Sequence, residues 1–383
     1  MDNTLPGFSL RKSFGKSLLY SLPMILITFV FISGGRPDFS DPLSAIASLA
    51  TFMLVNVLYF LMHYTGKTDR FRAVLFIIFA LSLSFTLISN MVETRNSMSF
   101  SQADILECKI PFCHLVIPMM IIPAAFTKSI IFPGTILGSF AGIASMVVLW
   151  LVATLVLGRG FCSWGCFYGG WDDGFSRLRK KPLLKKINDI WKWMPFAVLL
   201  MVSLTAALSL VPTYCDWICP FKAVTEFEEV TSVESAVKAG VFISLFAGLV
   251  VVLPVMTRKR TQCSFLCPLG AINTLSNKIT PFTVKIDKAS CTECFKCVAA
   301  CPLFALNQEG IKSGKVSVFC SKCGKCLDVC PNNAIHYGIK GVPSGTMKKF
   351  SRNLILFVSF LFMAVFASGS IIITVRGLLD LIF

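Results

Sequence analysis

The chain has 383 residues, of which 55% are hydrophobic and only 15% are charged, and its formal net charge is +16. This composition and a mean hydropathy of +0.73 exclude an ordinary soluble domain. The basic excess could indicate nucleic-acid binding, but no basic domain stands apart from the apolar segments, so we expect no nucleic-acid partner. We therefore predict a polytopic α-helical membrane protein in contact with the lipid bilayer.

A helix needs about 20 apolar residues to cross the hydrocarbon core. We predict about seven transmembrane helices, at residues 18–33, 43–63, 71–90, 134–157, 194–211, 236–257 and 354–375. If the N-terminus is cytosolic, the segments on that side carry 29 of the 36 Lys and Arg but 9 of the 20 Asp and Glu. This positive-inside pattern predicts a multi-pass protein of the cytoplasmic membrane with its C-terminus outside.

The cysteines and basic segments divide the chain into regions. A three-helix membrane region covers residues 1–92, and residues 93–157 hold an outer segment with Cys108 and Cys113 and the fourth span. An inner basic loop with Cys162 and Cys166 covers residues 158–193, and residues 194–270 hold the outer pair Cys215/Cys219 and the inner pair Cys263/Cys267. Residues 282–340 form an inserted cytoplasmic domain, and residues 353–383 form a last membrane helix.

The region between residues 71 and 270 contains a tandem repeat of two helices and two cysteine pairs. Residues 159–166 and 260–267 both read R-x-x-C-S-aromatic-x-C. Two repeats of the same direction imply a pseudo-two-fold axis along the membrane normal, so each repeat would donate one pair to a shared site on each side. This pairing predicts two iron-sulfur clusters, both of the 4Fe-4S type, with the ligands Cys162, Cys166, Cys263 and Cys267 inside and Cys108, Cys113, Cys215 and Cys219 outside.

Buried anionic clusters need compensating charge. Arg159 and Arg260 each precede a cysteine by three residues, and we expect them to supply that charge. The inner cysteines could instead be free structural thiols, and the outer ones could form disulfides or a reactive dithiol. His114 could replace one outer thiolate as an iron ligand.

The inserted domain carries two runs that both read C-x2-C-x2-C-x3-C-P. In bacterial-type ferredoxins, the fourth cysteine of each run ligates the cluster of the other run. We therefore predict an α+β domain with two 4Fe-4S clusters, one held by Cys291, Cys294, Cys297 and Cys330 and the other by Cys320, Cys323, Cys326 and Cys301. Zinc is the alternative occupant of such pairs, but two complete quartets favour iron-sulfur clusters.

The sequences C-D-W-I-C-P at residues 215–220, C-S-F-L-C-P-L-G at residues 263–270 and G-R-G-F-C at residues 158–162 precede this domain closely. Together these motifs resemble the membrane polyferredoxins of the NapH, NosR and CcoG type over roughly residues 150 to 340. Phe167 stands where that pattern has a proline after the second cysteine. The resemblance implies electron transfer between a quinol pool or cytosolic reductant and an extracytoplasmic reductase or maturation system.

The leading functional hypothesis is a transmembrane electron-transfer protein, an oxidoreductase component that passes single electrons through four iron-sulfur clusters. Its donor would be a cytosolic ferredoxin, flavodoxin or dehydrogenase, docked on Lys312, Lys315, Lys322 and Lys325, and its acceptor an extracytoplasmic redox protein or membrane partner subunit. Alternatives are a quinol dehydrogenase subunit with a quinone near His63 or His114, and a thiol-disulfide relay through the outer cysteines. With three histidines in the chain, we expect no haem.

Overall fold

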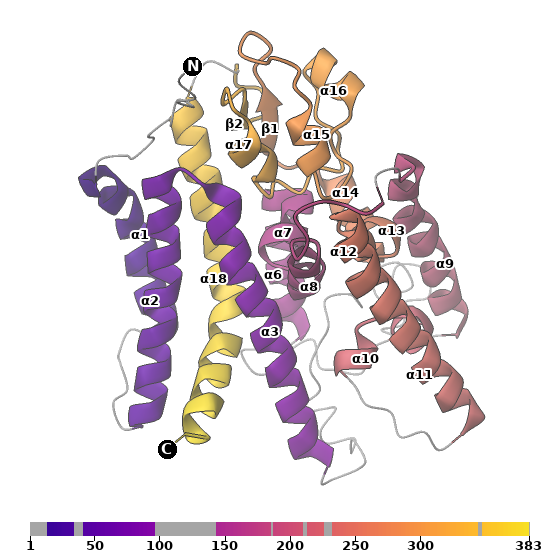
Figure 1. Cartoon of the computed structure of the whole chain (residues 1–383). Helices are drawn as coiled ribbons and strands as arrows, with labels where there is room; N and C mark the ends of the chain where they lie inside the picture. The colour runs from indigo at the N-terminus through magenta and orange to yellow at the C-terminus, as the bar shows by residue number, and fades with distance from the viewer. Residues whose placement is uncertain are drawn as a thin grey trace.

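Four long helices pack side by side at one side of the molecule. The computed structural model describes residues 14–33, 41–95, 143–184, 187–209, 213–225, 232–343 and 347–382. The four helices are α1 (Phe14–Ser33), α2 (Pro42–Thr65), α3 (Thr68–Arg95) and α18 (Lys348–Asp380) (Figure 1). Asp41 caps α2 by accepting a hydrogen bond from the Leu43 N–H at 3.1 Å, and Gly66 ends the helix in the left-handed conformation.

The other apolar helices lie from the centre of the molecule, where α6 (Ile143–Leu157) is placed, to the side opposite the four, where α9 (Met194–Ser209) and α11 (Val233–Leu245) are placed (Figure 1). A continuous helical run extends from α11 through η5 (Phe246–Val252) to α12 (Leu253–Thr257). Six of the described helical segments are long and apolar enough to cross a membrane. The expected span at residues 71–90 falls within α3, whose side chains are described only in part, so the count of seven stays a prediction.

Short helices connect the spans. The first cysteine of each inner pair lies in a helical turn, α7 (Phe161–Trp164) or α13 (Thr261–Phe265), and the second directly precedes a nine-residue helix, α8 (Phe167–Phe175) or α14 (Pro268–Ser276). The remaining connections contain η2 (Gly158–Gly160), η3 (Asp189–Trp193), the π-helical turn η4 (Tyr214–Ile218) and α10 (Lys222–Thr225).

The inserted domain sits at one end of the helices (Figure 1). Its two strands, β1 (Phe282–Ile286) and β2 (Ile335–Ile339), pair antiparallel with Phe282 opposite Ile339. Between them lie α15 (Lys296–Ala300), α16 (Gln308–Ser313) and α17 (Lys325–Val329). The Asp328 carboxylate accepts the N–H groups of Thr68 and Asp69 at 2.9 and 2.8 Å, so this domain caps the start of α3 and is fixed to the membrane helices.

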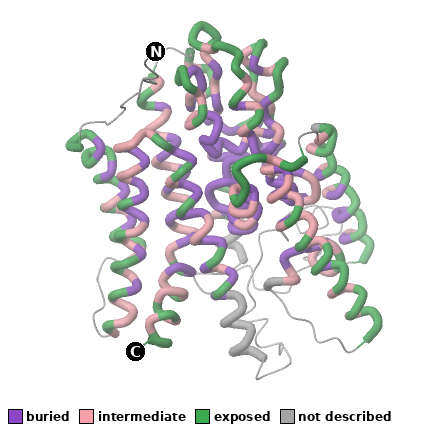
Figure 2. Tube along the Cα trace, viewed as in Figure 1, coloured by how far each residue is buried: buried purple, intermediate pink, exposed green. Residues whose placement is uncertain are grey.

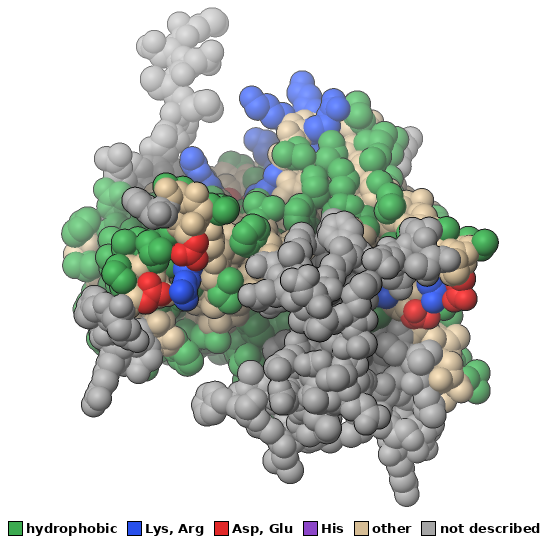
Figure 3. All heavy atoms as spheres, turned by 90° about the horizontal axis from the view of Figure 1, so that it is seen from below, with side chains coloured by type: hydrophobic (Ala, Val, Ile, Leu, Met, Phe, Trp, Pro, Cys, Tyr) green, Lys and Arg blue, Asp and Glu red, His purple; other side chains and the backbone are tan. Residues whose placement is uncertain are grey.

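Buried residues concentrate where the inserted domain meets the helices, whereas the outer faces of the helices are largely exposed (Figure 2). Leu208 in α9, for example, is 86% exposed. Hydrophobic side chains also dominate the coloured atoms of the face opposite the inserted domain, with Lys and Arg gathered at one edge (Figure 3). Such apolar surfaces suit contact with lipid or with partner helices.

Candidate iron-sulfur sites

Cys330, from the second cysteine run, lies beside the first three cysteines of the first run. Cys291, Cys294, Cys297 and Cys330 line one common pocket. We call these four residues ferredoxin site 1. Cys294 is exposed and Cys297 is buried, so this site reaches the protein surface on one side.

The reciprocal arrangement holds for the other quartet. Cys301 of the first run and Cys320, Cys323 and Cys326 of the second line one common pocket. These four residues are ferredoxin site 2. The Ala305 N–H donates a hydrogen bond to the Cys301 sulfur at 3.3 Å, and burial raises the pKa of the Cys320 thiol to about 12.

The two runs wrap their cavities with the same backbone conformation. Glu293 and Phe295 in the first run, and Lys322 and Gly324 in the second, adopt positive φ at matching positions. Left-handed residues reverse the chain direction, so each short run curls around its cavity. Only Gly324 adopts this conformation without cost, which indicates that the surrounding structure enforces it at the other three positions.

The cysteines of the two ferredoxin sites are arranged for a cluster of several iron atoms. Among residues that the structure describes, no group of three or more His, Cys, Asp or Glu side chains converges tightly enough for a single metal ion. The cysteines of both ferredoxin sites instead surround a cavity. Four cysteine ligands around such a space match the requirement of a 4Fe-4S cluster.

The two inner cysteine pairs have matching surroundings, and we call Cys162, Cys166, Cys263 and Cys267 the inner membrane site. Cys166 and Cys267 each stand one residue before a nine-residue helix, α8 and α14. Pro268 occupies the first position of α14, and Phe167 takes the same position in α8. All four cysteines are buried, and those of one pair lie within electrostatic reach of the other pair.

Arg159 and Arg260 each donate a hydrogen bond to a cysteine of the other inner pair. Arg260 donates to the Cys162 carbonyl at 2.6 Å and to the Cys263 sulfur at 3.3 Å, while Arg159 donates to the Cys263 carbonyl at 3.2 Å. Both guanidinium groups are fully buried. They therefore bring positive charge into a region where four thiolates would otherwise be uncompensated.

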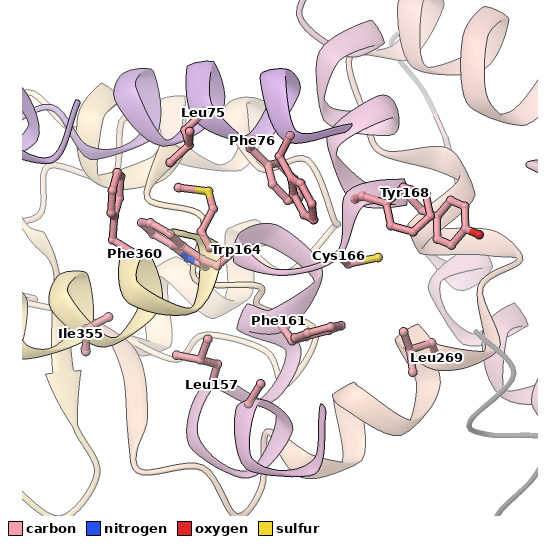
Figure 4. Packing of buried hydrophobic residues seen from close by; sticks show 14 of the residues in the cluster. Leu75, Phe76, Leu157, Phe161, Trp164, Cys166, Tyr168, Leu269, Ile355 and Phe360 are labelled. Atoms are coloured by element: carbon pink, nitrogen blue, oxygen red, sulfur yellow. The ribbon is translucent and has the colours of Figure 1, made fainter. Parts of the chain in front are cut away.

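Further polar groups contact the cysteines of the inner membrane site. The Asn273 amide donates to the Cys162 sulfur at 3.4 Å, and the Asp172 carboxylate accepts the Cys263 N–H at 2.9 Å. Hydrogen bonds to ligand sulfurs tune the potential of a cluster. Figure 4 shows Cys166 pointing away from the packed rings of Trp164 and Phe76, toward the side where Tyr168 lies.

The outer cysteines are described only in part. Cys108, Cys113 and His114 lie outside the described residues, so the expected outer cluster stays a prediction. Cys215 is half-buried in η4, Cys219 is buried at its end, and neither forms a disulfide with a described cysteine.

His63, proposed from the sequence to lie near a quinone, is fully buried with its ring 4.8 Å from that of Tyr59.

Residues next to ferredoxin site 2 and residues next to the inner membrane site are in direct contact. The Ser163 hydroxyl, next to Cys162, donates to the Ser321 hydroxyl, next to Cys320, at 2.8 Å. Arg72 donates to the Cys323 carbonyl at 3.1 Å and to the Ser163 carbonyl at 2.9 Å. Sequence reasoning missed Arg72, Ser163 and Ser321. The serine shared by both R-x-x-C-S motifs was the available signal.

A buried ionic network supports this contact. Arg72 pairs with Asp69 at 2.8 Å and with Asp173 at 2.9 Å, and Arg177 pairs with the same two carboxylates at 2.6 and 3.0 Å. Burial alone would raise the pKa of Asp173, but Arg177 and Arg72 outweigh it and hold that pKa well below its usual range. The network therefore stays charged at neutral pH.

Two of the four lysines expected to dock a donor are buried, which corrects that prediction for them. Lys322 and Lys325 are only 4% and 8% exposed. Lys322 donates to the Leu157 carbonyl and to the Asn277 side chain, both at 2.7 Å, and burial lowers its pKa to about 8. Lys322 thereby attaches the inserted domain to α6, and neither buried lysine is accessible to a soluble partner.

Comparison with protein families places the cysteines in known domain types. A 4Fe-4S dicluster domain matches residues 283–331. The chain therefore carries ferredoxin-type 4Fe-4S domains. A second family model, a 4Fe-4S binding domain, matches three times, at residues 139–186, 192–228 and 239–287, so Cys162/Cys166, Cys215/Cys219 and Cys263/Cys267 each fall within one match. The expected iron-sulfur character is confirmed, whereas the number of clusters stays a prediction.

Three curated proteins illustrate the similarity. An uncharacterized protein of Methanocaldococcus jannaschii is 27% identical over 44% of this chain and 80% of its own length. The putative electron transport protein YccM of Escherichia coli is 24% identical over 41% of this chain and 45% of its own, and the methylamine utilization ferredoxin-type protein MauN of Methylobacillus flagellatus is 27% identical over 45% and 58%. The chain thus spans about half the length of the last two. No solved structure shows a significant match.

Proposed function

We propose that the protein conducts single electrons across the cytoplasmic membrane, from ferredoxin site 1 through ferredoxin site 2 and the inner membrane site to the outer cysteines. The observation that carries this proposal is the hydrogen bond between Ser163 and Ser321, which joins residues adjacent to Cys162 and Cys320. Electron transfer between clusters needs short separations, and this contact brings residues adjacent to the two sites within 2.8 Å of each other.

A 4Fe-4S cluster held by each cysteine quartet would accept and release one electron at a time. The chain's own residues orient and insulate these positions. Arg159 and Arg260 balance the charge of the inner membrane site, and Asn273 hydrogen-bonds a sulfur there. Because these groups are already fixed and buried, little reorganisation would accompany a change in charge, which suits rapid transfer.

The matched surroundings of the two inner pairs support a tandem repeat with a pseudo-two-fold axis through the inner membrane site. On this proposal the axis relates Arg159 to Arg260, since each contacts a cysteine carbonyl of the other half. The same symmetry would bring Cys108 and Cys113 to Cys215 and Cys219. It also agrees with the resemblance to the NapH, NosR and CcoG type of membrane polyferredoxin.

The donor would meet ferredoxin site 1, where Cys294 is exposed. A cytosolic ferredoxin, flavodoxin or dehydrogenase fits this position, and the acceptor would be an extracytoplasmic redox protein or a membrane partner subunit. The names of YccM and MauN, an electron transport protein and a ferredoxin-type protein, support this role. The basic excess of the segments around the inserted domain favours a cytoplasmic position for it.

The test uses the full chain in lipid vesicles that contain ferricyanide, with dithionite added outside. The wild-type protein should reduce the trapped ferricyanide, whereas Cys263→Ala should abolish this and lose about four irons per chain, the content of one cluster. Cys162→Ala should remove the same EPR signal as Cys263→Ala. A wild-type protein that fills its ferredoxin sites with iron yet leaves trapped ferricyanide oxidised would refute transmembrane conduction.

A further inference from the structure

One tyrosine links the outer pair Cys215/Cys219 to the inner membrane site. Tyr214 directly precedes Cys215, and its side chain is fully buried. The Gln262 amide donates a hydrogen bond to the Tyr214 hydroxyl at 3.1 Å. Gln262 directly precedes Cys263, and its carbonyl accepts the Cys267 N–H at 3.2 Å. A single side-chain hydrogen bond therefore joins the neighbours of both sites.

The Tyr214 hydroxyl is also subject to the charge of cysteine thiols from both segments. It lies within electrostatic reach of Cys215 and Cys219, and of Cys267 in the inner membrane site. The segments that carry Cys215 and Cys263 are thus joined directly through one tyrosine and one glutamine side chain.

Burial of the polar Gln262 side chain at this contact lowers the stability of the folded protein. Gln262 is 2% exposed, and its Oε1 atom has no hydrogen-bond partner among the residues that the structure describes. An unsatisfied buried polar atom costs about 1–3 kcal/mol. An apolar side chain of similar size would avoid that cost, so packing alone does not account for a glutamine that reaches the tyrosine.

A second, independent contact links the segment after Cys219 to the other inner pair, Cys162/Cys166. The rings of Tyr168 and Phe221 lie 4.1 Å apart at an angle of 43°. Tyr168 follows Cys166 by two residues, and Phe221 follows Cys219 by two. Residues within two positions of Cys215 and of Cys219 therefore each contact a residue near an inner cysteine, Gln262 in the first case and Tyr168 in the second.

We propose that the Tyr214–Gln262 hydrogen bond is the bridge over which electrons pass between the inner membrane site and the outer cysteines. This inference deepens the proposed function and rests on it. One electron leaves an iron-sulfur cluster held at one site and one arrives at a cluster held at the other, with no covalent bond formed or broken. Tyr214 and Gln262 are positioning residues that provide the coupling, and neither is oxidised in the step.

Two substitutions interrupt the bridge with little change in volume. Tyr214→Phe removes only the hydroxyl, and Gln262→Leu removes the amide. Each replaces a hydrogen bond with a wider packing gap. We therefore expect the rate at which trapped ferricyanide is reduced in the vesicle assay, divided by the amount of bound iron, to fall about tenfold. The control is Tyr59→Phe, at an equally buried tyrosine that packs on Phe360, and it should leave the rate unchanged.

EPR of the fully reduced protein gives a readout that does not depend on conduction. The bridge predicts magnetic interaction between the inner and outer centres in the wild type, retained in Tyr214→Phe because the backbone still sets their separation. Independent spectra in the wild type, or wild-type rates per iron in both bridge variants, would overturn the inference. If the wild type itself fails to reduce the trapped acceptor, the proposed function fails instead, so the two failures are distinguishable.

Discussion

Gly169 and Gly270 occupy equivalent positions in the two inner segments, yet adding a methyl group should affect them very differently. Each follows the second cysteine of its pair by three residues. A Cβ atom at Gly169 would lie 2.3 Å from Arg260 Nη2 and 2.3 Å from the Cys162 carbonyl oxygen. A Cβ at Gly270 would lie 3.1 Å from the Cys263 carbonyl and 3.9 Å from Arg159 Nη2.

The magnitudes follow from these distances. Gly169→Ala must break the hydrogen bond from Arg260 to Cys162, which at a charged donor is worth about 1.5–3 kcal/mol. It must also displace packed backbone, which costs about 1–3 kcal/mol. The inner membrane site should therefore lose roughly 2.5 to 6 kcal/mol of stability in Gly169→Ala, but only about 1 kcal/mol or less in Gly270→Ala, where a small shift suffices.

The assay is iron content and EPR of the purified full chain. Gly169→Ala should lose the signal and the roughly four irons of the inner membrane site while keeping both ferredoxin signals. Gly270→Ala should keep all of them. Gly240→Ala in α11 is the matched control, since nothing lies within 4 Å of its added Cβ. Full iron in Gly169→Ala, or equal losses in Gly169→Ala and Gly270→Ala, would refute the reasoning.

Two further predictions concern the inserted domain and the ionic network. Cys291→Ala and Cys330→Ala should eliminate the same ferredoxin EPR signal, and Cys301→Ala should eliminate the other signal. If Cys301→Ala and Cys330→Ala removed the same signal, the assignment of each run's fourth cysteine to the other run's site would be contradicted. Asp173→Asn should lower the free energy of unfolding at pH 7 by roughly 3–5 kcal/mol, because Arg72 loses a buried partner. Since the folded-state pKa of Asp173 lies below its unfolded value, wild-type stability from this group declines below about pH 4. Thermal unfolding in detergent from pH 7 to 3 should show the gap between wild type and variant narrowing, and a constant gap would count against the network.

Local spacing made the cysteine groups predictable. The two C-x2-C-x2-C-x3-C-P runs each fix a loop of a few residues, so the sequence alone suggested which cysteine would cross between them. The shared R-x-x-C-S pattern likewise pointed to the arginines before the inner cysteines. In both cases the informative residues lie within about ten positions of one another.

Contacts between distant segments were not predictable in the same way. The contact between Ser163 and Ser321 spans 158 residues of sequence, and nothing near either serine specifies the other. The error for Lys322 and Lys325 has the same origin, because a lysine between cysteines has the appearance of a surface residue until the whole domain docks. From the sequence, Arg72 is only one of the many positive charges that indicate membrane topology, although in the structure it is fully buried.

The attachment of the inserted domain determines which of its motions could accompany turnover. Asp328 caps α3, Lys259 donates to the Cys301 carbonyl at 2.6 Å, and the Arg260 N–H donates to the Pro302 carbonyl at 2.9 Å. Anchored by both cysteine runs, the domain has no freedom to swing between partners as a shuttling carrier does. Turnover would then be governed by how fast soluble partners arrive and depart, and should depend on solvent viscosity only through those encounters.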